Sequence, residues 1–236
     1  MKKTIILTLV TLITLSLNAQ SLLPKKYGVK IGANIANIHS EPNTGVENIE
    51  SSPLIGVSGG FYMEIPLNDK WYINPELIYS QKGASFNYNY YHDYEVNQRD
   101  LHSTSNELKL TYIEINPTIS YKTSKRLALN FGPSISSLLS FEYNILSDKG
   151  DNDTDPLHEM LDDATYSEET LDFGLNLGLS YYLSDDLLIE GKVNTGFMSI
   201  GSISKEIYTG SDPDKLKEKI YELKNLGVVF SIGYLF

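Results

Sequence analysis

The sequence predicts an all-β protein, an eight-stranded antiparallel up-and-down transmembrane β-barrel with short periplasmic turns and long extracellular loops. Three observations support this fold class. Apolar residues recur at every second position in eight segments, the connections between these segments alternate between short and long, and the face opposite each apolar face carries mostly small or polar residues. A period of two indicates a β-strand with one apolar face.

The eight segments follow one another from Tyr27 to the last residue, Phe236. The predicted strands are 27–39, 54–65, 71–82, 110–121, 127–139, 171–183, 187–199 and 226–236. The clearest alternation is LDFGLNLGLSYYL at 171–183, where every odd position is Leu, Phe or Tyr. A strand that crosses a bilayer at a tilt needs about 9–11 residues, so each segment is long enough to span one.

The predicted connections alternate strictly in length. The short ones read PLND, KTSK and SDD, and the long ones lie near 40–53, 83–109, 140–170 and 200–222. Short turns at one end and long loops at the other are typical of outer-membrane barrels. A soluble sandwich has no reason to sort its connections in this way.

The second face of each strand indicates which side meets lipid. In 171–183 this face reads Asp172, Gly174, Asn176, Gly178, Ser180 and Tyr182. Small polar residues suit the interior of a narrow barrel, because eight strands leave just enough room for side chains. We therefore expect Leu175, Leu177 and Leu179 to face lipid and Asn176 and Gly178 to face the lumen. A soluble, lipocalin-like barrel with reversed faces is the alternative.

The same parity places seven charged residues inside the barrel: Lys30, Glu64, Glu76, Glu114, Asp172, Glu190 and Lys192. A buried charge needs a partner, so we expect an interior network of salt bridges and hydrogen bonds that plugs the lumen. A proton or ion path is the alternative. Because acids outnumber bases in this set, some carboxylates are expected to be protonated or hydrated.

The N-terminus has the pattern of a secretory signal peptide. Lys2 and Lys3 precede an apolar run, and Ala19 is a small residue suited to cleavage. We expect 1–19 to be removed and 20–236 to form one barrel domain. The formal net charge of −11 disfavours nucleic acid as a partner. The absence of cysteine excludes disulfides, thiolate metal sites and thiol nucleophiles.

An acidic segment, 148–163, lies in the third long connection. Asp151, Asp153 and Asp155 alternate there as in a calcium-binding loop, but Pro156 stands where an EF-hand needs Gly. We expect a solvated acidic loop, with weak divalent-cation binding as the alternative.

Two Asp-Pro pairs in the long connections could each open a short helix. Asp155-Pro156 would begin one that runs through Met160 and Leu161. Asp212-Pro213 would begin another, before Leu216 and Ile220.

Aromatic residues gather in the second long connection. Phe86, Tyr88, Tyr90, Tyr94 and Val96 share one parity. We expect a hairpin that continues past the membrane with tyrosines in the interfacial girdle. A loop that presents an aromatic binding surface is the alternative.

Other residue types carry weaker signals. The histidines His39, His92, His102 and His158 lie in or at the edge of long connections, without a His-x-x-His pair or a nucleophile motif. We therefore predict no catalytic, cofactor-binding or metal-ligating residue. Pro75, Pro117 and Pro133 fall within predicted strands, where a lost ladder hydrogen bond is expected to need a bulge.

Several short motifs resemble a known family when their order and spacing are taken together. They are NAQ at 18–20, YGVKIGANIAN at 27–37, NPELIYSQKG at 74–83, YIEINPTISY at 112–121, FGPSIS at 131–136 and GYLF at 233–236. The chain resembles the "porin family" outer-membrane β-barrel domain of Gram-negative bacteria, similar in architecture to OmpX and the OmpA barrel. The resemblance covers essentially the whole mature chain and implies an outer-membrane location without a defined activity.

The resemblance also implies a role for the last strand. In similar barrels this strand ends in an aromatic residue that the insertion machinery reads, and Phe236 matches that signal. The expected partners are therefore outer-membrane lipid and the barrel-assembly machinery. We expect a monomeric, non-catalytic outer-membrane protein with extracellular loops and both termini in the periplasm. A narrow porin or small-solute channel, and a lipid-modifying enzyme, are the alternatives.

Overall fold

The computed structural model describes residues 23–42, 50–95, 98–148, 171–198, 201–207 and 216–236. These ranges form nine β-strands: β1 (Lys26–Pro42), β2 (Glu50–Pro66), β3 (Trp71–Glu95), β4 (Gln98–Lys122), β5 (Leu127–Asp148), β6 (Leu171–Tyr182), β7 (Leu187–Gly196), β8 (Gly201–Ile207) and β9 (Leu216–Leu235). No helix in these ranges is long and apolar enough to cross a membrane.

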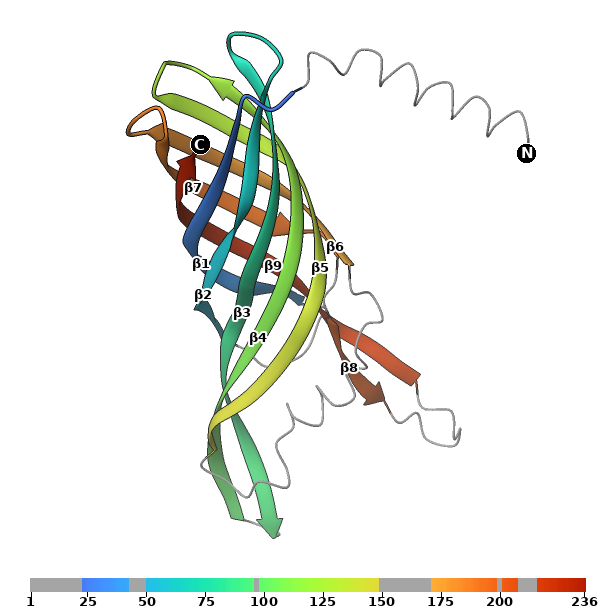
Figure 1. The fold of residues 1–236 in the computed structure, drawn as a ribbon. Coiled ribbons are helices and arrows are strands. Elements are labelled where there is room, and N and C mark those ends of the chain that lie inside the picture. The colour runs from blue at the N-terminus through green and yellow to red at the C-terminus, as the bar shows by residue number, and fades with distance from the viewer. Residues whose placement is uncertain (1–22, 43–49, 96–97, 149–170, 199–200, 208–215) are drawn as a thin grey trace, which may run out of the picture.

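Eight of the strands close into a ring. Strands β1 to β7 pair in chain order, β7 pairs with β9, and β9 pairs back to β1, all antiparallel. Val29 marks the closure, because it lies opposite Phe61 of β2 on one side and Tyr234 of β9 on the other. The predicted eight-stranded up-and-down barrel is confirmed (Figure 1). Closure leaves no free strand edge inside the ring.

Two of the predicted long connections contain strands. Strands β3 and β4 run to Glu95 and from Gln98, which confirms the hairpin predicted within the connection 83–109. Part of 200–222 forms β8, which pairs with the outer part of β9. The helix predicted near Leu216 and Ile220 is strand, because β9 begins at Leu216. Backbone groups beyond the lipid can pair between neighbouring strands, so strands need not end at the membrane surface.

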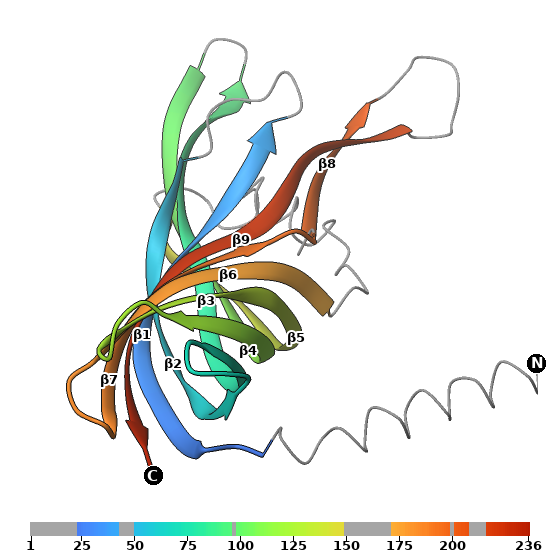
Figure 2. The ribbon, with the colours of Figure 1, turned by 90° about the horizontal axis from the view of Figure 1, so that it is seen from above.

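The outer parts of these strands leave the ring as two separate arms. The β3–β4 hairpin, with the outer part of β5, extends away from the outer parts of β8 and β9 (Figures 1 and 2). Both arms lie at the end opposite the short turns.

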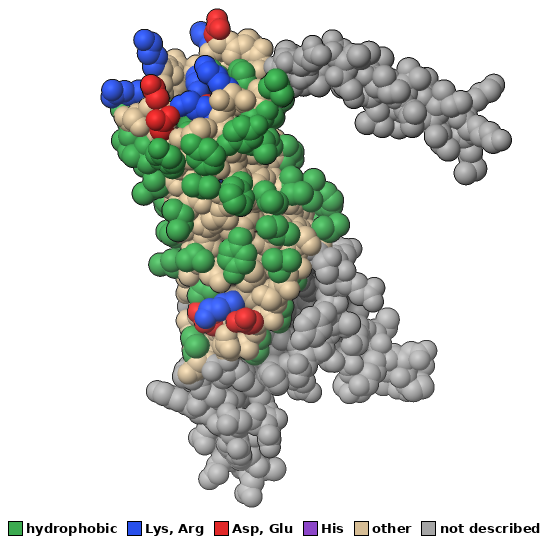
Figure 3. Space-filling view, in the orientation of Figure 1, with side chains coloured by type: hydrophobic (Ala, Val, Ile, Leu, Met, Phe, Trp, Pro, Cys, Tyr) green, Lys and Arg blue, Asp and Glu red, His purple; other side chains and the backbone are tan. Residues whose placement is uncertain are grey.

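The two faces of the wall are as predicted. In β6 the burial strictly alternates, with Leu177 66 % exposed and its neighbour Asn176 3 % exposed. Apolar side chains form a band around the outside of the barrel (Figure 3). The core is therefore polar and lies inside the ring, as expected for a transmembrane barrel.

The three short turns share one hydrogen-bonding pattern. In Leu67–Lys70, Thr123–Arg126 and Leu183–Asp186 the first residue's N–H donates to the carbonyl of the residue that opens the next strand, at 2.8–2.9 Å. The backbone N–H of that same strand-opening residue donates to a polar side chain at the second position of the turn, at 3.0–3.1 Å. This side chain is Asn68, Ser124 or Ser184. These turns confirm the short connections predicted at the same places.

The prolines do not need the predicted bulges. Pro75 and Pro117 lie directly opposite each other, and neither the β2–β3 nor the β4–β5 register shifts beside them. In β4 and β5, Ile115 lies opposite Ile135 and Ile119 lies opposite Phe131, so the register is the same on both sides of Pro117. Residues 116–118 of β4 have no paired residue on β5. Pro117 and Pro133 therefore face each other across a gap in the ladder, since neither has an N–H to donate.

Candidate functional site in the barrel lumen

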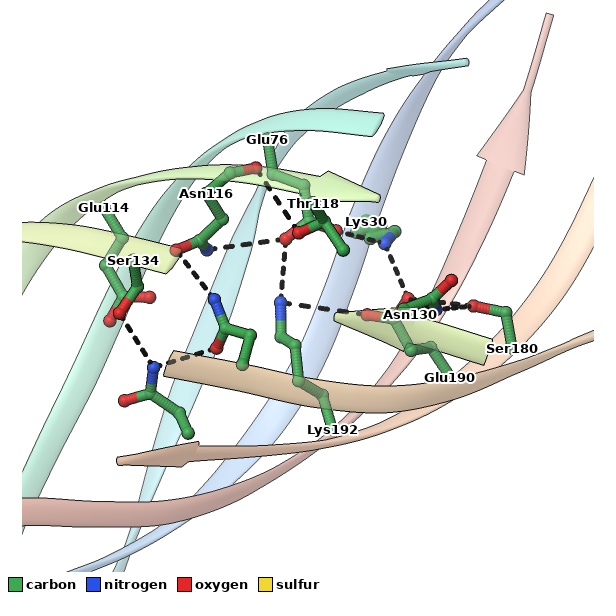
Figure 4. Close-up of polar contacts among 12 residues, drawn as sticks. Lys30, Glu76, Glu114, Asn116, Thr118, Asn130, Ser134, Ser180, Glu190 and Lys192 are labelled. Carbon is green, nitrogen blue, oxygen red and sulfur yellow. Dashed lines mark hydrogen bonds and ion pairs between the residues drawn. The ribbon is translucent and has the colours of Figure 1, made fainter. Parts of the chain in front are cut away.

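Four charged side chains form a closed ring of ion pairs in the middle of the lumen. Lys30 Nζ lies 2.6 Å from Glu76 Oε1 and 3.0 Å from Glu190 Oε2. Lys192 Nζ lies 2.7 Å from Glu76 Oε2 and 3.8 Å from Glu190 Oε1. All four side chains are buried (Figure 4). Each ammonium group therefore sits between two carboxylates, and each carboxylate between two ammonium groups.

This ring spans the lumen. Glu76 projects from β3 and Lys192 from β7, and these strands lie on opposite walls of the eight-stranded ring. Lys30 of β1 joins the same two walls from the side. Ser180 Oγ and Asn130 Nδ2 also donate to Glu190 Oε2, at 2.9 and 3.0 Å. The central carboxylates are thus held by charged and neutral donors together.

A second level lies toward the long-loop end. Lys82 Nζ lies 2.7 Å from Glu114 Oε1 and donates to Asn194 Oδ1 at 2.9 Å, again from β3 to β7. Asn194 Nδ2 donates to Asn176 Oδ1 at 2.9 Å, and Asn176 Nδ2 donates to Asn116 Oδ1 at 3.1 Å. The chain of amides connects this level to the central ring, because Asn116 Nδ2 lies within 3.4 Å of Glu76 Oε2 (Figure 4).

The two ends of the lumen are bridged as well. Near the short turns, the Tyr182 hydroxyl of β6 donates to Glu64 of β2, and Lys122 Nζ lies 3.3 Å from the same carboxylate. Toward the long loops, Asn225 Nδ2 of β9 donates to Asp172 Oδ2 at 3.0 Å and to the Tyr112 hydroxyl of β4 at 3.1 Å. Both bridges join opposite walls of the ring.

The interior charge is closer to balance than the sequence analysis predicted. Lys82, 3 % exposed, and Lys122, at the edge of the lumen, were missed, although both share the inward parity of their strands. With them, four lysines stand against the five predicted carboxylates. The remaining carboxylate, Asp172, accepts from Asn225 and from the Met198 N–H at 3.2 Å. The described contacts therefore give each of these five carboxylates at least one partner.

Small residues make room for this filling. A Cβ atom at Gly28 would collide with the Tyr62 ring, and one at Gly196 would collide with the Asp172 carboxylate. The space left among the central charges, from Lys30 to Asn194, amounts to about 20 Å³. A cavity of this size holds about one water molecule. Side chains therefore fill the lumen at the level of the charge ring.

Outward aromatic residues form a belt near the short turns. It consists of Tyr27, Trp71, Tyr121, Tyr181, Tyr234 and Phe236. The rings of Trp71 and Tyr121 lie 4.8 Å apart. Such belts mark the lipid–water boundary in membrane barrels. The side chains of Tyr88, Tyr90 and Tyr94, where a girdle was predicted, lie outside the described residues.

The loop candidates have mixed outcomes. The predicted continuation of the strand through Phe86 is confirmed, but Phe86 points inward and is 6 % exposed, so it is not part of an outer girdle. Asp151, Asp153, Asp155 and His158 lie outside the described residues. In the described part of the chain, no group of three or more His, Asp or Glu side chains is placed to hold a metal ion.

A closed ring with an apolar outer wall and a polar core defines a transmembrane β-barrel protein. The outer membrane protein beta-barrel domain matches residues 18–201, and the chain belongs to this family.

Solved structures of similar barrels include Ail, the attachment invasion locus protein of Yersinia pestis, with 10 % identity, TM-score 0.37, and coverage of 91 % of this chain and 100 % of that one. Neisserial surface protein A has 11 % identity, TM-score 0.40, and coverage of 89 % and 97 %. OprG from Pseudomonas aeruginosa has 10 % identity, TM-score 0.37, and coverage of 92 % and 98 %. No curated protein matched the chain.

Proposed function

We propose that this protein is a non-catalytic outer-membrane β-barrel that holds its long loops at the cell surface and whose lumen does not conduct. The observation that carries this proposal is the series of bridges between opposite walls. They join Tyr182 to Glu64, Lys192 to Glu76, Lys82 to Asn194 and Asn225 to Tyr112. A continuous water path would have to break each of them and leave buried charges with fewer partners, which is costly.

Orientation, assembly and oligomeric state are part of the same proposal. We place the short turns and both termini in the periplasm and the two strand arms outside the cell. The barrel-assembly machinery would read β9, whose neighbour Phe236 presents an outward side chain that is 68 % exposed. A monomer suffices, because the ring has no unpaired edge in the membrane that a second copy would need to cover.

The test of the closed lumen is solute uptake by liposomes that contain the refolded barrel. We expect no swelling above that of protein-free liposomes with arabinose, glycine or glucose as the solute. A wide general porin in the same lipid serves as the positive control. Swelling rates that rise with the amount of barrel and fall with solute size would contradict the proposal and favour a narrow channel.

The non-catalytic part of the proposal is tested separately. The described interior carboxylates are occupied by ion pairs or amide donors, which leaves none poised as a free general base. Mass spectrometry of outer-membrane lipids should give the same lipid species with and without the protein. A lipid that gains or loses an acyl chain only when the protein is present would support an enzyme instead.

A further inference from the structure

A polar hollow opens at the short-turn end of the lumen. Its volume is about 330 Å³, and its lining includes Lys25, Lys26, Lys122 and Lys125 together with Tyr72 and Tyr182. The only acids in its lining are Glu64 and Asp185. Lys and Arg side chains, with Asp and Glu side chains among them, lie at this end of the molecule, above the apolar band (Figure 3). The net charge of the chain is −11, whereas the lining of the hollow holds four lysines and two acids and is locally positive.

Two of the acids at this end are already paired. Glu64 accepts from Tyr182 and from Lys122, and Asp186 forms an ion pair with Lys26 at 3.0 Å. The Asp185 carbonyl also accepts from Lys26. By contrast, Lys25 and Lys125 form no ion pair with any described residue and are exposed. The hollow therefore has two ammonium groups outside any described ion pair, against one such carboxylate in its lining, that of Asp185.

The floor of the hollow is fixed. The Lys122 ammonium group lies 4.0 Å from the centre of the Tyr72 ring and 4.7 Å from that of Tyr182, which holds it by cation–π contacts. Below it, the Tyr182–Glu64 bridge crosses the lumen. A solute that enters from the short-turn side therefore meets a dead end with a positively charged rim, which is the form of a binding pocket rather than of a channel mouth.

We propose that this hollow binds a small phosphate-bearing anion from the short-turn side. Ammonium groups at the rim can each donate up to three hydrogen bonds to phosphate oxygens, and such charge-assisted bonds are stronger than neutral ones. The lining comes from inward-facing residues, from two short turns and from Lys25 just before β1, and it surrounds the open end of the lumen. The ligand is therefore a soluble anion and not the headgroup of a lipid beside the outer wall. This site goes beyond the proposed function and does not depend on the lumen being closed further along.

The probe is inorganic phosphate, added to the refolded full barrel in zwitterionic micelles at constant ionic strength. We expect saturable NMR shifts of backbone amides around Lys25, Lys122 and Lys125, and none at the level of the central charge ring. Lys25→Gln combined with Lys125→Gln should weaken binding at least about tenfold, since one charge-assisted hydrogen bond accounts for about that factor. Amide spectra of the variant report whether it is folded.

The matched control is Lys70→Gln together with Lys109→Gln. Lys70 lies in a short turn outside the lining, and Lys109 lies toward the other end, so the control loses the same charge. Phosphate affinity should stay within about twofold of wild type. An equal loss in both variants, shifts that never saturate, or binding seen only with phosphatidylglycerol vesicles and not with phosphate would overturn the proposal.

Discussion

The interior charges are stabilised because each one has several partners. Lys192 touches both Glu76 and Glu190, and Lys30 touches the same two carboxylates. In a water-poor lumen such contacts are stronger than they are at a surface, and an unpaired charge is correspondingly costly. The number of partners per charge therefore matters more than the number of charges.

Lys192→Met should destabilise the barrel strongly, because two buried carboxylates would then share Lys30 alone. We expect a loss of about 3–5 kcal/mol in the free energy of unfolding, measured by urea titration in lipid vesicles. Adding Glu76→Gln to this variant should recover much of the loss, since one buried ammonium then meets one carboxylate. A double variant less stable than Lys192→Met would contradict the ring of ion pairs.

The cost of replacing an outward leucine by arginine should depend on how deep that leucine lies in the membrane. Leu177→Arg places a charge near the middle of the apolar band and should cost about 2–4 kcal/mol, whereas Leu183→Arg at the short-turn rim should cost about 0–1 kcal/mol. Both leucines are exposed on the same outer face. Vesicle refolding with urea titration measures both. Equal costs for the two variants would mean that the band does not lie in lipid.

At the scale of strands, Pro75, Pro117 and Pro133 lie side by side on β3, β4 and β5, and the β4–β5 ladder has a gap at Pro117 and Pro133. Pro75 and Pro117 lie opposite each other and neither has an N–H, so they form a non-hydrogen-bonded pair. The backbone groups at 117 therefore point toward β5, and Pro117→Ala supplies an N–H that can donate to the Pro133 carbonyl. Hydrogen exchange by NMR should show the new amide protected as well as that of Ile119. Exchange as fast as that of the turn amide of Lys125 would contradict this register.

Strand parity could be predicted from the sequence, and strand length could not. Alternation from Leu171 to Leu183 identifies both faces of β6, because lipid and lumen accept different side chains. No comparable signal marks where a strand ends beyond the apolar band, so β8 was expected as part of a loop, and the hairpin of β3 and β4 was predicted from its aromatic parity without its bounds. Lys82 was missed for a related reason, since it is the last residue of the predicted strand.

The sequence predicted most of the charged residues that lie inside the lumen but not which of them pair with each other. Inward parity indicated that Lys30, Glu76 and Glu190 would be buried together, and they are. Which carboxylate meets which lysine depends on the stagger between distant strands such as β3 and β7. That stagger is a property of the closed ring and not of any one segment.

For the whole molecule, the central claim is that bridges between opposite walls close the lumen. The most direct test is single-channel recording of the refolded wild-type monomer in a planar bilayer of neutral lipid with 1 M KCl. We predict a silent baseline with at most rare, brief openings, because each bridge would have to break at the same time. Steady openings on the order of a nanosiemens, in proportion to the amount of inserted monomer, would contradict the closed lumen, since eight strands leave room only for the side chains that fill them.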